Sequence, residues 1–394
     1  MSLSRRSLMT AVAVSSQMTA AAVRPLVALQ KGLVYMNAAN IAPCGKVALA
    51  AYLKQLADFQ ENPAFQNREI YKALSESVRA KLANLLSAAP DEIALTRNSS
   101  ESNNLIAQGL RLKPGDEILI TAHNHPSNTQ SWQLRAQQAG ATVVVADVPI
   151  YAKSPDELLA TLQSKVTPKT RVIAVSHLTN TTGLLYPIAA IADLAHQANA
   201  WCHVDGAQTF GWMNLHLPNL KIDSFSGSFH KWPMGPLESG MLYVRAARLP
   251  ELTPAILSID YWADKPTGAR KFETLGQRDD PKLRGLEKTI DLLATTGMAQ
   301  IESRALALAA RFRSGLDAVP GVALKGSGHP SVSGPVIKVD FPNQVLATVY
   351  NRLWTQHRIA IAKTDSGDAA GLRFSPHIYN TEAEIDLVLR ALRA

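Results

Sequence analysis

The sequence predicts an α/β protein with a mostly parallel, mixed sheet of about seven strands in a large domain, followed by a smaller α+β domain. Three observations lead to this prediction. Short apolar runs alternate with helical patterns between residues 70 and 250, turn residues separate them, and the pattern changes after residue 280. The 394 residues are 46% hydrophobic and 18% charged, so the chain can bury a large core.

Seven runs have the length and composition of strands: residues 92–96, 117–121, 142–146, 171–176, 201–205, 224–227 and 240–244. Helical patterns lie between most of them, at residues 102–110, 129–138, 155–163 and 188–199. Apolar strands that alternate with helices form a parallel sheet covered on both faces. The last strands follow one another without a full helix, so we expect at least one antiparallel strand.

The smaller domain is predicted from the pattern after residue 280. It contains helices at 283–296, 298–319, 344–357 and 381–393 and a strand at 335–341. Thr381 and Glu384 have the spacing of a capping box at the start of the last helix. We expect residues 25–62 to pack with this domain. The predicted boundaries are therefore 1–24, 25–62, 63–275 and 276–394.

The first 24 residues resemble an export signal. Ser4-Arg-Arg-Ser-Leu8 has the twin-arginine pattern, an apolar stretch follows it, and Ala20-Ala-Ala22 is a candidate cleavage site. Ser15, Ser16 and Gln17 interrupt the stretch, which is too polar and too short for a transmembrane helix. We expect export to the periplasm, with a cytoplasmic location as the alternative.

The charge and the cysteines limit the class of ligand. The net charge is +8, but the chain has no run of five basic residues, so we expect an anionic small molecule rather than nucleic acid or a membrane. An anion- or nucleic-acid-binding protein remains the alternative suggested by charge alone. Cys44 and Cys202 are far apart and lie in no CxxC pattern. We therefore expect two free thiols and no metal site.

Polar residues directly follow several predicted strands, at the edge where α/β sheets bind ligands. Ser99 and Ser100 open a helix, whose free amides suit a phosphate. His125 and Asn180 follow two further strands, and Asp205 ends another. A metal bound by His123 and His125 is disfavoured because no third ligand has suitable spacing. These positions fit one ligand at one edge of the sheet.

Lys231 lies in the turn Ser228-Phe-His-Lys231, after the next strand, where Ser228 and His230 are further phosphate donors. A lysine amine in a partly desolvated pocket can attack an aldehyde. Asp205 can keep a pyridine nitrogen protonated, as pyridoxal phosphate (PLP) needs in order to withdraw electrons. The sequence therefore predicts a PLP enzyme in which Lys231 forms the Schiff base.

These residues resemble the class V aminotransferases of PLP fold type I, which include cysteine desulfurases, kynureninases and isopenicillin N epimerases. The resemblance covers nearly the whole chain after residue 32. The most specific motifs are His203-Val-Asp-Gly-Ala-Gln208, Ser228-Phe-His-Lys231 and Arg373-Phe-Ser-Pro-His-Ile-Tyr-Asn-Thr381. The stretch from His230 to Val244 is most similar to the isopenicillin-N-epimerase-like branch.

The resemblance implies a role for each candidate residue. Lys231 is the Schiff-base lysine, Asp205 pairs with the pyridinium, and His125 stacks on the ring. The other implied contacts are Asn180 and Gln208 to the phenolic oxygen, Ser99, Ser100, Ser228 and His230 to the phosphate, and Arg373 and Asn40 to the substrate.

The resemblance also implies a homodimer with active sites at the subunit interface. A Gly-Thr segment of the neighbouring subunit usually touches the phosphate in this family. Here the segment is Leu275-Gly-Gln-Arg-Asp279, so Gln277 stands where Thr is common.

One departure from the family pattern concerns the reaction. Cysteine desulfurases carry a nucleophilic Cys in a loop before the carboxylate-binding Arg. The corresponding residues here, 361–373, contain no Cys. From this difference we expect that the protein is not a cysteine desulfurase.

The expected function is that of a PLP-dependent aminotransferase acting on an amino acid or peptide-like substrate. The alternatives are an isopenicillin-N-epimerase-like racemase or epimerase and a β-eliminating lyase. A PLP-binding interaction protein without turnover is the non-enzymatic alternative.

Overall fold

The computed structural model describes residues 23–258, 261–262, 265–364 and 370–393. All but the last two residues of the predicted export signal, 1–24, lie outside the described residues. The structure therefore does not test that prediction.

A seven-stranded sheet forms the centre of the large domain, in the order β2-β8-β7-β6-β5-β3-β4. Its strands are β2 (Ile93–Thr96), β3 (Glu117–Thr121), β4 (Thr142–Ala146), β5 (Thr170–Ser176), β6 (Trp201–Asp205), β7 (Ser224–Ser228) and β8 (Gly240–Val244). β8 runs antiparallel to both of its neighbours, and the pairs from β7 to β4 are parallel.

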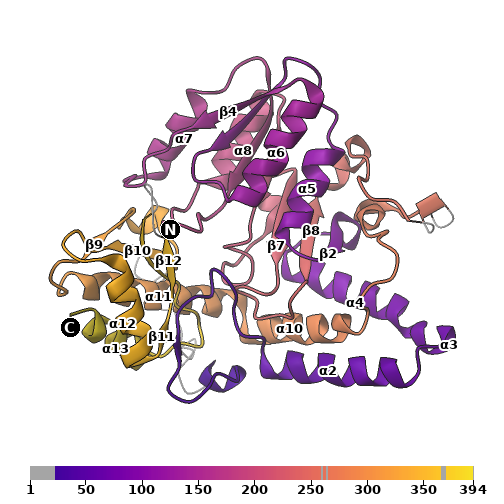
Figure 1. Ribbon diagram of the computed structural model, residues 1–394. Helices are drawn as coiled ribbons and strands as arrows, with labels where there is room; N and C mark the ends of the chain where they lie inside the picture. Colours follow the sequence, from indigo (N-terminus) through magenta and orange to yellow (C-terminus); the bar gives the residue numbers. More distant parts are fainter. Residues whose placement is uncertain (1–22, 259–260, 263–264, 365–369, 394) are drawn as a thin grey trace, which may run out of the picture.

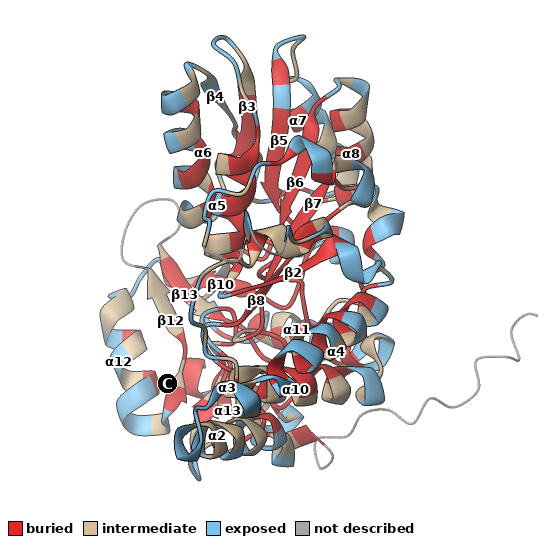
Figure 2. Ribbon diagram, turned by 90° about the vertical axis from the view of Figure 1, so that its right-hand side faces the viewer, coloured by how far each residue is buried: buried red, intermediate tan, exposed pale blue. Residues whose placement is uncertain are grey.

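Helices cover both faces of this sheet because alternate strand residues are apolar on both sides. In β5, Ile173 and Val175 face one core and Val172 and Ala174 face the other. The first core is covered by α4 (Ile70–Leu85), α7 (Pro155–Gln163) and α8 (Ile188–Gln197), and the second by α5 (Ser99–Gly109) and α6 (Pro126–Ala139). Figure 2 shows the buried strands between these helices.

The smaller domain contains an antiparallel sheet in the order β12-β13-β10-β9. The strands are β9 (Ala323–Leu324), β10 (Ile337–Asp340), β12 (Ala362–Thr364) and β13 (Gly371–Phe374). Its helices are α11 (Met298–Leu316), α12 (Leu346–His357) and α13 (Glu382–Arg393), which pack on the face that carries Val339, Leu372 and Phe374. The opposite face carries Lys338 and Arg373.

The N-terminal segment joins both domains. β1 (Val34–Tyr35) pairs with β11 (Ile359–Ala360), and α2 (Lys46–Glu61) packs along α10 (Lys282–Thr296) at the bottom of Figure 1. The short helix α3 (Phe65–Arg68) leads into α4. Short 3₁₀ helices lie at Arg24–Leu26, Pro90–Glu92, Leu217–Leu220, Ala246–Glu251, Gly268–Phe272 and Pro330–Val332.

The predicted fold class is confirmed: the chain has a mixed seven-stranded sheet and a second, smaller α+β unit. The capping box of α13 is also confirmed, because Thr381 Oγ1 accepts from Glu384 N at 3.1 Å and Glu384 accepts from Thr381 N at 3.0 Å. The proposed domain boundaries stay a prediction.

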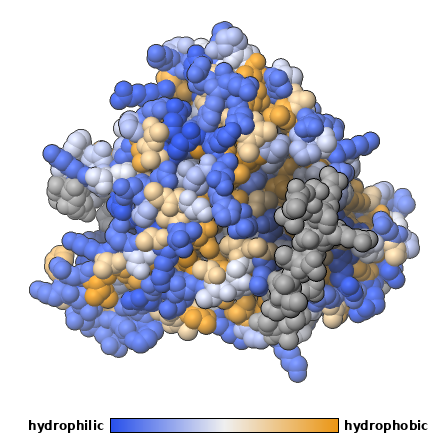
Figure 3. Space-filling model, turned by 180° about the vertical axis from the view of Figure 1, so that it is seen from behind, coloured by the Kyte–Doolittle hydropathy of each residue, from blue (hydrophilic) through white to orange (hydrophobic). Residues whose placement is uncertain are grey.

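Hydrophilic residues cover most of the face seen from behind, with hydrophobic residues in small groups between them (Figure 3). Within the described part of the chain, no helix is long and apolar enough to cross a membrane.

Candidate active site

A cavity of about 150 Å³ lies at the carboxyl edge of the central sheet. It collects residues from the ends of β2, β3, β5, β6 and β7. Nine of the predicted site residues line it: Ser99, Ser100, His125, Asn180, Asp205, Gln208, Ser228, His230 and Lys231. The parallel strands bring these distant positions together because their carboxyl ends share one edge.

Lys231 supplies the amine of this cavity. Burial lowers the pKa of Lys231, the negative charge of Asp205 opposes this shift, and the positive charge of Arg373 adds to it. A lowered pKa increases the fraction of unprotonated amine near neutral pH. Lys231 thus has the electrostatic environment that attack on an aldehyde requires.

Asp205 is buried at the end of β6 and accepts a hydrogen bond on each oxygen. Its Oδ1 accepts from the Ala207 amide at 3.0 Å, and its Oδ2 accepts from Asn103 Nδ2 at 3.0 Å. Both oxygens of this buried carboxylate thus have a hydrogen-bond donor. This carboxylate is suited to hold a proton on a pyridine nitrogen.

Asn103 is oriented by a chain of hydrogen bonds from β6 and β7. Asn103 Oδ1 can only accept, so His203 Nε2 donates to it at 3.0 Å. In the uncharged ring Nδ1 is then an acceptor, and it accepts from the Ser224 hydroxyl at 2.8 Å, while Trp201 donates to the same Ser224 Oγ at 2.8 Å. Burial lowers the pKa of His203 to about 4, so this chain is uncharged at neutral pH. These hydrogen bonds orient Asn103, and through it Asp205, without placing a positive charge beside the carboxylate.

The phosphate-binding candidates lie at the start of α5. Asn98 caps this helix by accepting from Glu101 N at 2.9 Å, and Ser228 Oγ lies 2.9 Å from the Ser99 amide. A Cβ on Gly240 would lie 2.6 Å from Asn98 Cα, so only glycine lets β8 approach this turn so closely. Free amides and hydroxyls at a helix N-terminus are donors for an anion.

His230 has a buried Nδ1 with no hydrogen-bond partner among the described residues. Burial and the nearby Lys231 charge lower the pKa of His230 to about 4. A buried ring nitrogen without a partner is costly, and a phosphate oxygen would satisfy it. Together with the cap at α5, Lys231 and Asp205, this donor set fits PLP.

His125 caps α6, and its ring is fixed from one side. Its Nδ1 accepts from the Ser127 amide at 3.2 Å and lies 2.8 Å from Ser127 Oγ. Burial lowers the pKa of His125, Lys231 and Arg373 lower it further, and Asp205 opposes the shift. The imidazole that borders the cavity is therefore uncharged at neutral pH.

Gln208 already uses both ends of its amide. Its Nε2 donates to Ala39 O at 2.8 Å, and its Oε1 accepts from Trp232 at 2.9 Å. One N–H of this amide remains for a ligand.

Arg373 connects the smaller domain to the cavity. It donates to Asn180 O at 2.8 Å and to Asn37 Oδ1 at 3.1 Å, and its buried Nε has no partner among the described residues. Burial lowers the pKa of Arg373 to about 10, although Tyr35 opposes the shift, so the guanidinium stays charged at neutral pH. Asn37 contacts it, whereas the predicted Asn40 is exposed in the next turn.

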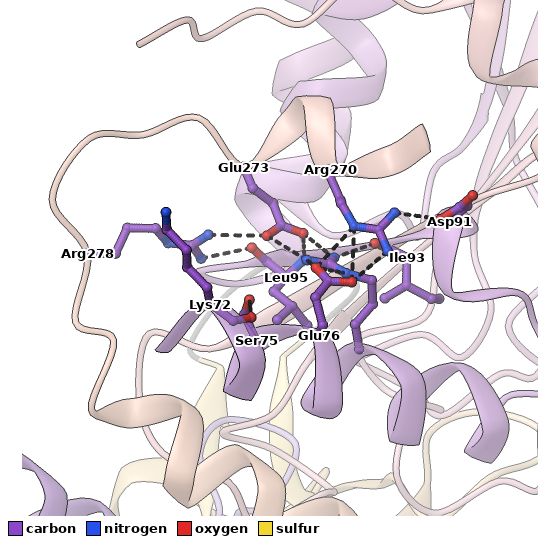
Figure 4. A network of polar contacts seen from close by, with 10 residues as sticks. Lys72, Ser75, Glu76, Asp91, Ile93, Leu95, Arg270, Glu273 and Arg278 are labelled. Atoms are coloured by element: carbon purple, nitrogen blue, oxygen red, sulfur yellow. Dashed lines mark hydrogen bonds and ion pairs between the residues drawn. The ribbon is translucent and has the colours of Figure 1, made fainter. Parts of the chain in front are cut away.

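Gln277 lies outside the cavity around Lys231. It accepts from Arg68 at 2.6 Å and borders a separate cavity of about 820 Å³. The segment is anchored at Glu273, which accepts from Arg79 at 2.5 Å. Glu273 also accepts from the Leu95 amide at 2.7 Å (Figure 4). Within one chain, Gln277 therefore does not reach the candidate phosphate site.

Asn37, Asn103 and His203 are site residues that the sequence analysis did not assign. His203 begins one of the motifs quoted above, and Asn103 lies three residues after Ser100, but their roles depend on side chains from other strands. Among the described residues, no group of three or more His, Cys, Asp or Glu is placed to hold a metal ion.

The family model described as "Aminotransferase class-V" matches residues 34–388. The chain belongs to the class V aminotransferases. It is therefore a PLP-dependent class V enzyme that acts on amino acids.

Two relatives of this class V enzyme have different names. "Isopenicillin N epimerase" of Streptomyces clavuligerus is 31% identical over 84% of this chain and 86% of its own length. A "Probable cysteine desulfurase" of Synechocystis sp. is 30% identical over 81% of this chain and 80% of its own. The first agrees with the predicted epimerase-like branch.

Solved structures share the fold of the class V enzyme. C-DES, described as a cystine C–S lyase, has a TM-score of 0.83 and 26% identity, covering 91% of this chain and 97% of its own. The cysteine desulfurase CsdA of Escherichia coli has a TM-score of 0.81 and 26% identity, covering 95% and 97%. A mutant of C-DES carries glycine covalently linked to its PLP cofactor.

These similarities correct one prediction. The expectation that the chain is not a cysteine desulfurase is wrong, because relatives and solved structures with that name match most of the class V enzyme. The error came from treating one missing loop cysteine as decisive. The fold and the cofactor site are common to several reactions, so one missing side chain does not exclude a whole class.

Proposed function

We propose that this class V enzyme is an aminotransferase that binds an amino acid through its carboxylate and moves the α-proton with Lys231. The position of Lys231 carries the proposal. Its amine, with a lowered pKa, borders the same cavity as Asp205, and the charge of Arg373 is close enough to act on it.

When bound, PLP withdraws electrons from the α-carbon of an amino acid, so that a proton can leave that carbon. Lys231 accepts this proton as a general base. Arg373 holds the substrate carboxylate, for which its planar fork is suited. Asp205 keeps the proton at the pyridine nitrogen. A single lysine that takes a proton and returns it on the same face favours transamination over inversion.

The test is to incubate the PLP-loaded enzyme with a panel of L- and D-amino acids. We expect at least one to give a keto acid and to convert the cofactor to pyridoxamine phosphate, both measured by mass spectrometry. No change in absorbance and no product with any amino acid would contradict the proposal and favour a PLP-binding protein without turnover.

Epimerisation is a second candidate, supported by the 31% identity to isopenicillin N epimerase. His125 is an uncharged base that borders the same cavity as Lys231. Incubation in D₂O separates the two reactions. Epimerisation gives the opposite enantiomer with deuterium at the α-carbon and no keto acid, whereas loss of a β-substituent would indicate a lyase.

We also propose a homodimer in which Gln277 reaches the neighbour's phosphate site, and export to the periplasm by the twin-arginine-like signal. The position of Gln277 beside the wider cavity supports the first proposal. Light scattering of the full chain tests the dimer, and cell fractionation tests the location. A monomer with full PLP affinity would contradict the role of Gln277.

A further inference from the structure

Lys338 is a buried lysine that the proposed mechanism does not use. It lies in the middle of β10, directly opposite Arg373 of β13 in the antiparallel register, and it is 0% exposed. Paired residues of neighbouring strands point to the same face, with Cβ atoms about 5 Å apart. Lys338 and Arg373 therefore share the face of the sheet turned away from the helices of the smaller domain.

In the part of the chain that the structure describes, the ammonium of Lys338 has a hydroxyl partner but no carboxylate partner. Its Nζ donates to Thr364 Oγ1 at 2.8 Å. Among the described residues, no carboxylate lies within ion-pair distance of Lys338 or of Arg373, while the nearby Asp340 pairs with Lys325 at 3.9 Å. Within the described ranges, the buried Lys338 and the partly buried Arg373 thus share one sheet face without a carboxylate partner.

The backbone makes room for this lysine. A Cβ on Gly371 would lie 2.5 Å from Val339 O and 2.9 Å from Lys338 Cε, so the glycine lets both the β10 backbone and the Lys338 side chain approach β13. Gly371 has a φ of +142°, a conformation that L side chains rarely adopt. The glycine at position 371 therefore leaves the space that the Lys338 side chain occupies.

An unpaired buried cation is unfavourable, and a second cation beside it increases the cost. Burial lowers the pKa of Lys338 to about 8, and the charges of Arg373 and Lys325 contribute to this shift. Such an arrangement is stabilised when an anionic ligand binds to it. Buried titratable groups with shifted pKa values are frequent at functional sites.

We propose that Lys338 binds a second carboxylate of the substrate, so that the enzyme acts on amino acids with an acidic side chain. Arg373 holds the α-carboxylate and Lys338 holds the distal one. This inference rests on the proposed function, because it places the substrate's α-carboxylate at Arg373. The substrate class is that of glutamate or aspartate, free or at the end of a longer molecule.

The first experiment compares isosteric substrates. For the PLP-loaded enzyme we expect kcat/KM for L-glutamate or L-aspartate to exceed that for the matching amide by about tenfold or more, as for a hydrogen bond to a charged group. Lys338→Met removes the charge at similar volume and should make the values for the acid and the amide equal. Lys325→Met, which changes the neighbouring cation, should keep the preference.

A binding measurement makes the test independent of turnover. By calorimetry on the PLP-loaded enzyme, glutarate should bind about tenfold more tightly than butyrate, and equally well after Lys338→Met. Thermal unfolding separates this role from a structural one. Lys338→Met should fold and keep or raise the melting temperature because it removes an unpaired buried charge.

Three results would overturn the inference: equal use of acid and amide, unchanged preference in Lys338→Met, or a marked loss of stability in that variant. If no amino acid changes the cofactor spectrum at all, the proposed function itself fails. Turnover of neutral amino acids alone refutes only the role of Lys338.

Discussion

At the scale of single residues, Asp205 depends on groups that never touch the cofactor site directly. Asn103 gives Asp205 one of its two hydrogen bonds, and His203 orients Asn103. Removing the Asn103 amide would leave one oxygen of a buried carboxylate without a donor. This raises the free energy of the ionised form.

We therefore expect Asn103→Leu to weaken PLP binding about tenfold and to reduce protonation of the ring nitrogen. The measurement is ¹⁵N NMR of the bound cofactor, labelled at the ring nitrogen, together with a PLP titration. Asn104→Leu is the control, because Asn104 is exposed and donates to a backbone carbonyl. A ¹⁵N shift equal to that of the wild type would contradict this role of Asn103.

Lys231→Ala tests the proton-transfer role. We expect the absorption band of the Schiff base to disappear and the rate of α-proton exchange to fall by about 10²–10⁴-fold. Lys221→Ala should change neither, because Lys221 is exposed and pairs with Asp193 at 2.9 Å. Retention of the band in Lys231→Ala would assign the covalent link to another lysine.

Sequence reasoning located the polar residues that follow strands, because their position alone brings them to one edge. It did not identify Asn103, His203 or Asn37, since each acts through a partner from a distant segment. It chose Asn40, which is exposed, where Asn37 contacts Arg373. Asn37 and Asn40 are three residues apart, and the geometry of the turn between them decides which one reaches Arg373. Hydrophobic periodicity does not predict the geometry of that turn.

At the scale of elements, the seven strands of the central sheet were predicted within one residue at each end. For example, β5 covers 170–176 where 171–176 was expected. In the smaller domain only β10 was predicted, at 335–341 instead of 337–340. Helix ends were less accurate: the helical pattern of α5 is visible only from residue 102, although the helix begins at Ser99, one of the two serines expected to open it. The cap by Asn98 explains the difference. Its extended backbone and side-chain hydrogen bond start the helix before the apolar pattern becomes visible.

The start of α5 depends on the close approach of β8. Gly240→Ala should push Asn98 outward, because a Cβ would lie 2.6 Å from its Cα. We expect PLP affinity to fall at least several-fold, as measured by titration with tryptophan fluorescence. Gly328→Ala is the matched control, since its Cβ would meet only Leu324 Cδ2 at 3.5 Å. Equal PLP affinity in both variants would contradict the dependence of the α5 start on the close approach of β8.

At the scale of the whole molecule, the ion pair between Arg79 and Glu273 connects the helix α4 to the segment before α10. Arg79 is 2% exposed and also pairs with Glu76 of the same helix. Glu273→Gln should lower the free energy of unfolding by about 3 kcal/mol, the low end for a broken buried pair, because Glu76 remains. Urea unfolding measures this change. Glu251→Gln, at a half-exposed pair, should cost about 0.5 kcal/mol or less.

Stability should also fall in mild acid. Burial lowers the pKa of His177 to about 3 and those of His203 and His377 to about 4. Because unfolded histidine has a pKa of about 6.5, the unfolded chain takes up protons first as the pH falls. Above pH ~6.5 the three buried histidines do not lower the free energy of unfolding. Below that pH they lower it by up to about 4 kcal/mol per pH unit, which is the combined effect of three protons taken up by the unfolded chain. Urea midpoints that stay constant between pH 7 and 5 would refute this.

The hydrogen bonds of Asn37 to Arg373 and of Ala39 to Ser375 each join residues 336 positions apart. Such pairs raise the contact order of the chain, and contacts of this kind form late in folding because a long loop must close first. During synthesis, Asn37 and Ala39 therefore wait for their partners until Arg373 and Ser375 have been added. The carboxylate-binding site can become complete only after that point, so a shorter nascent chain can bury its central sheet but has no place for a substrate.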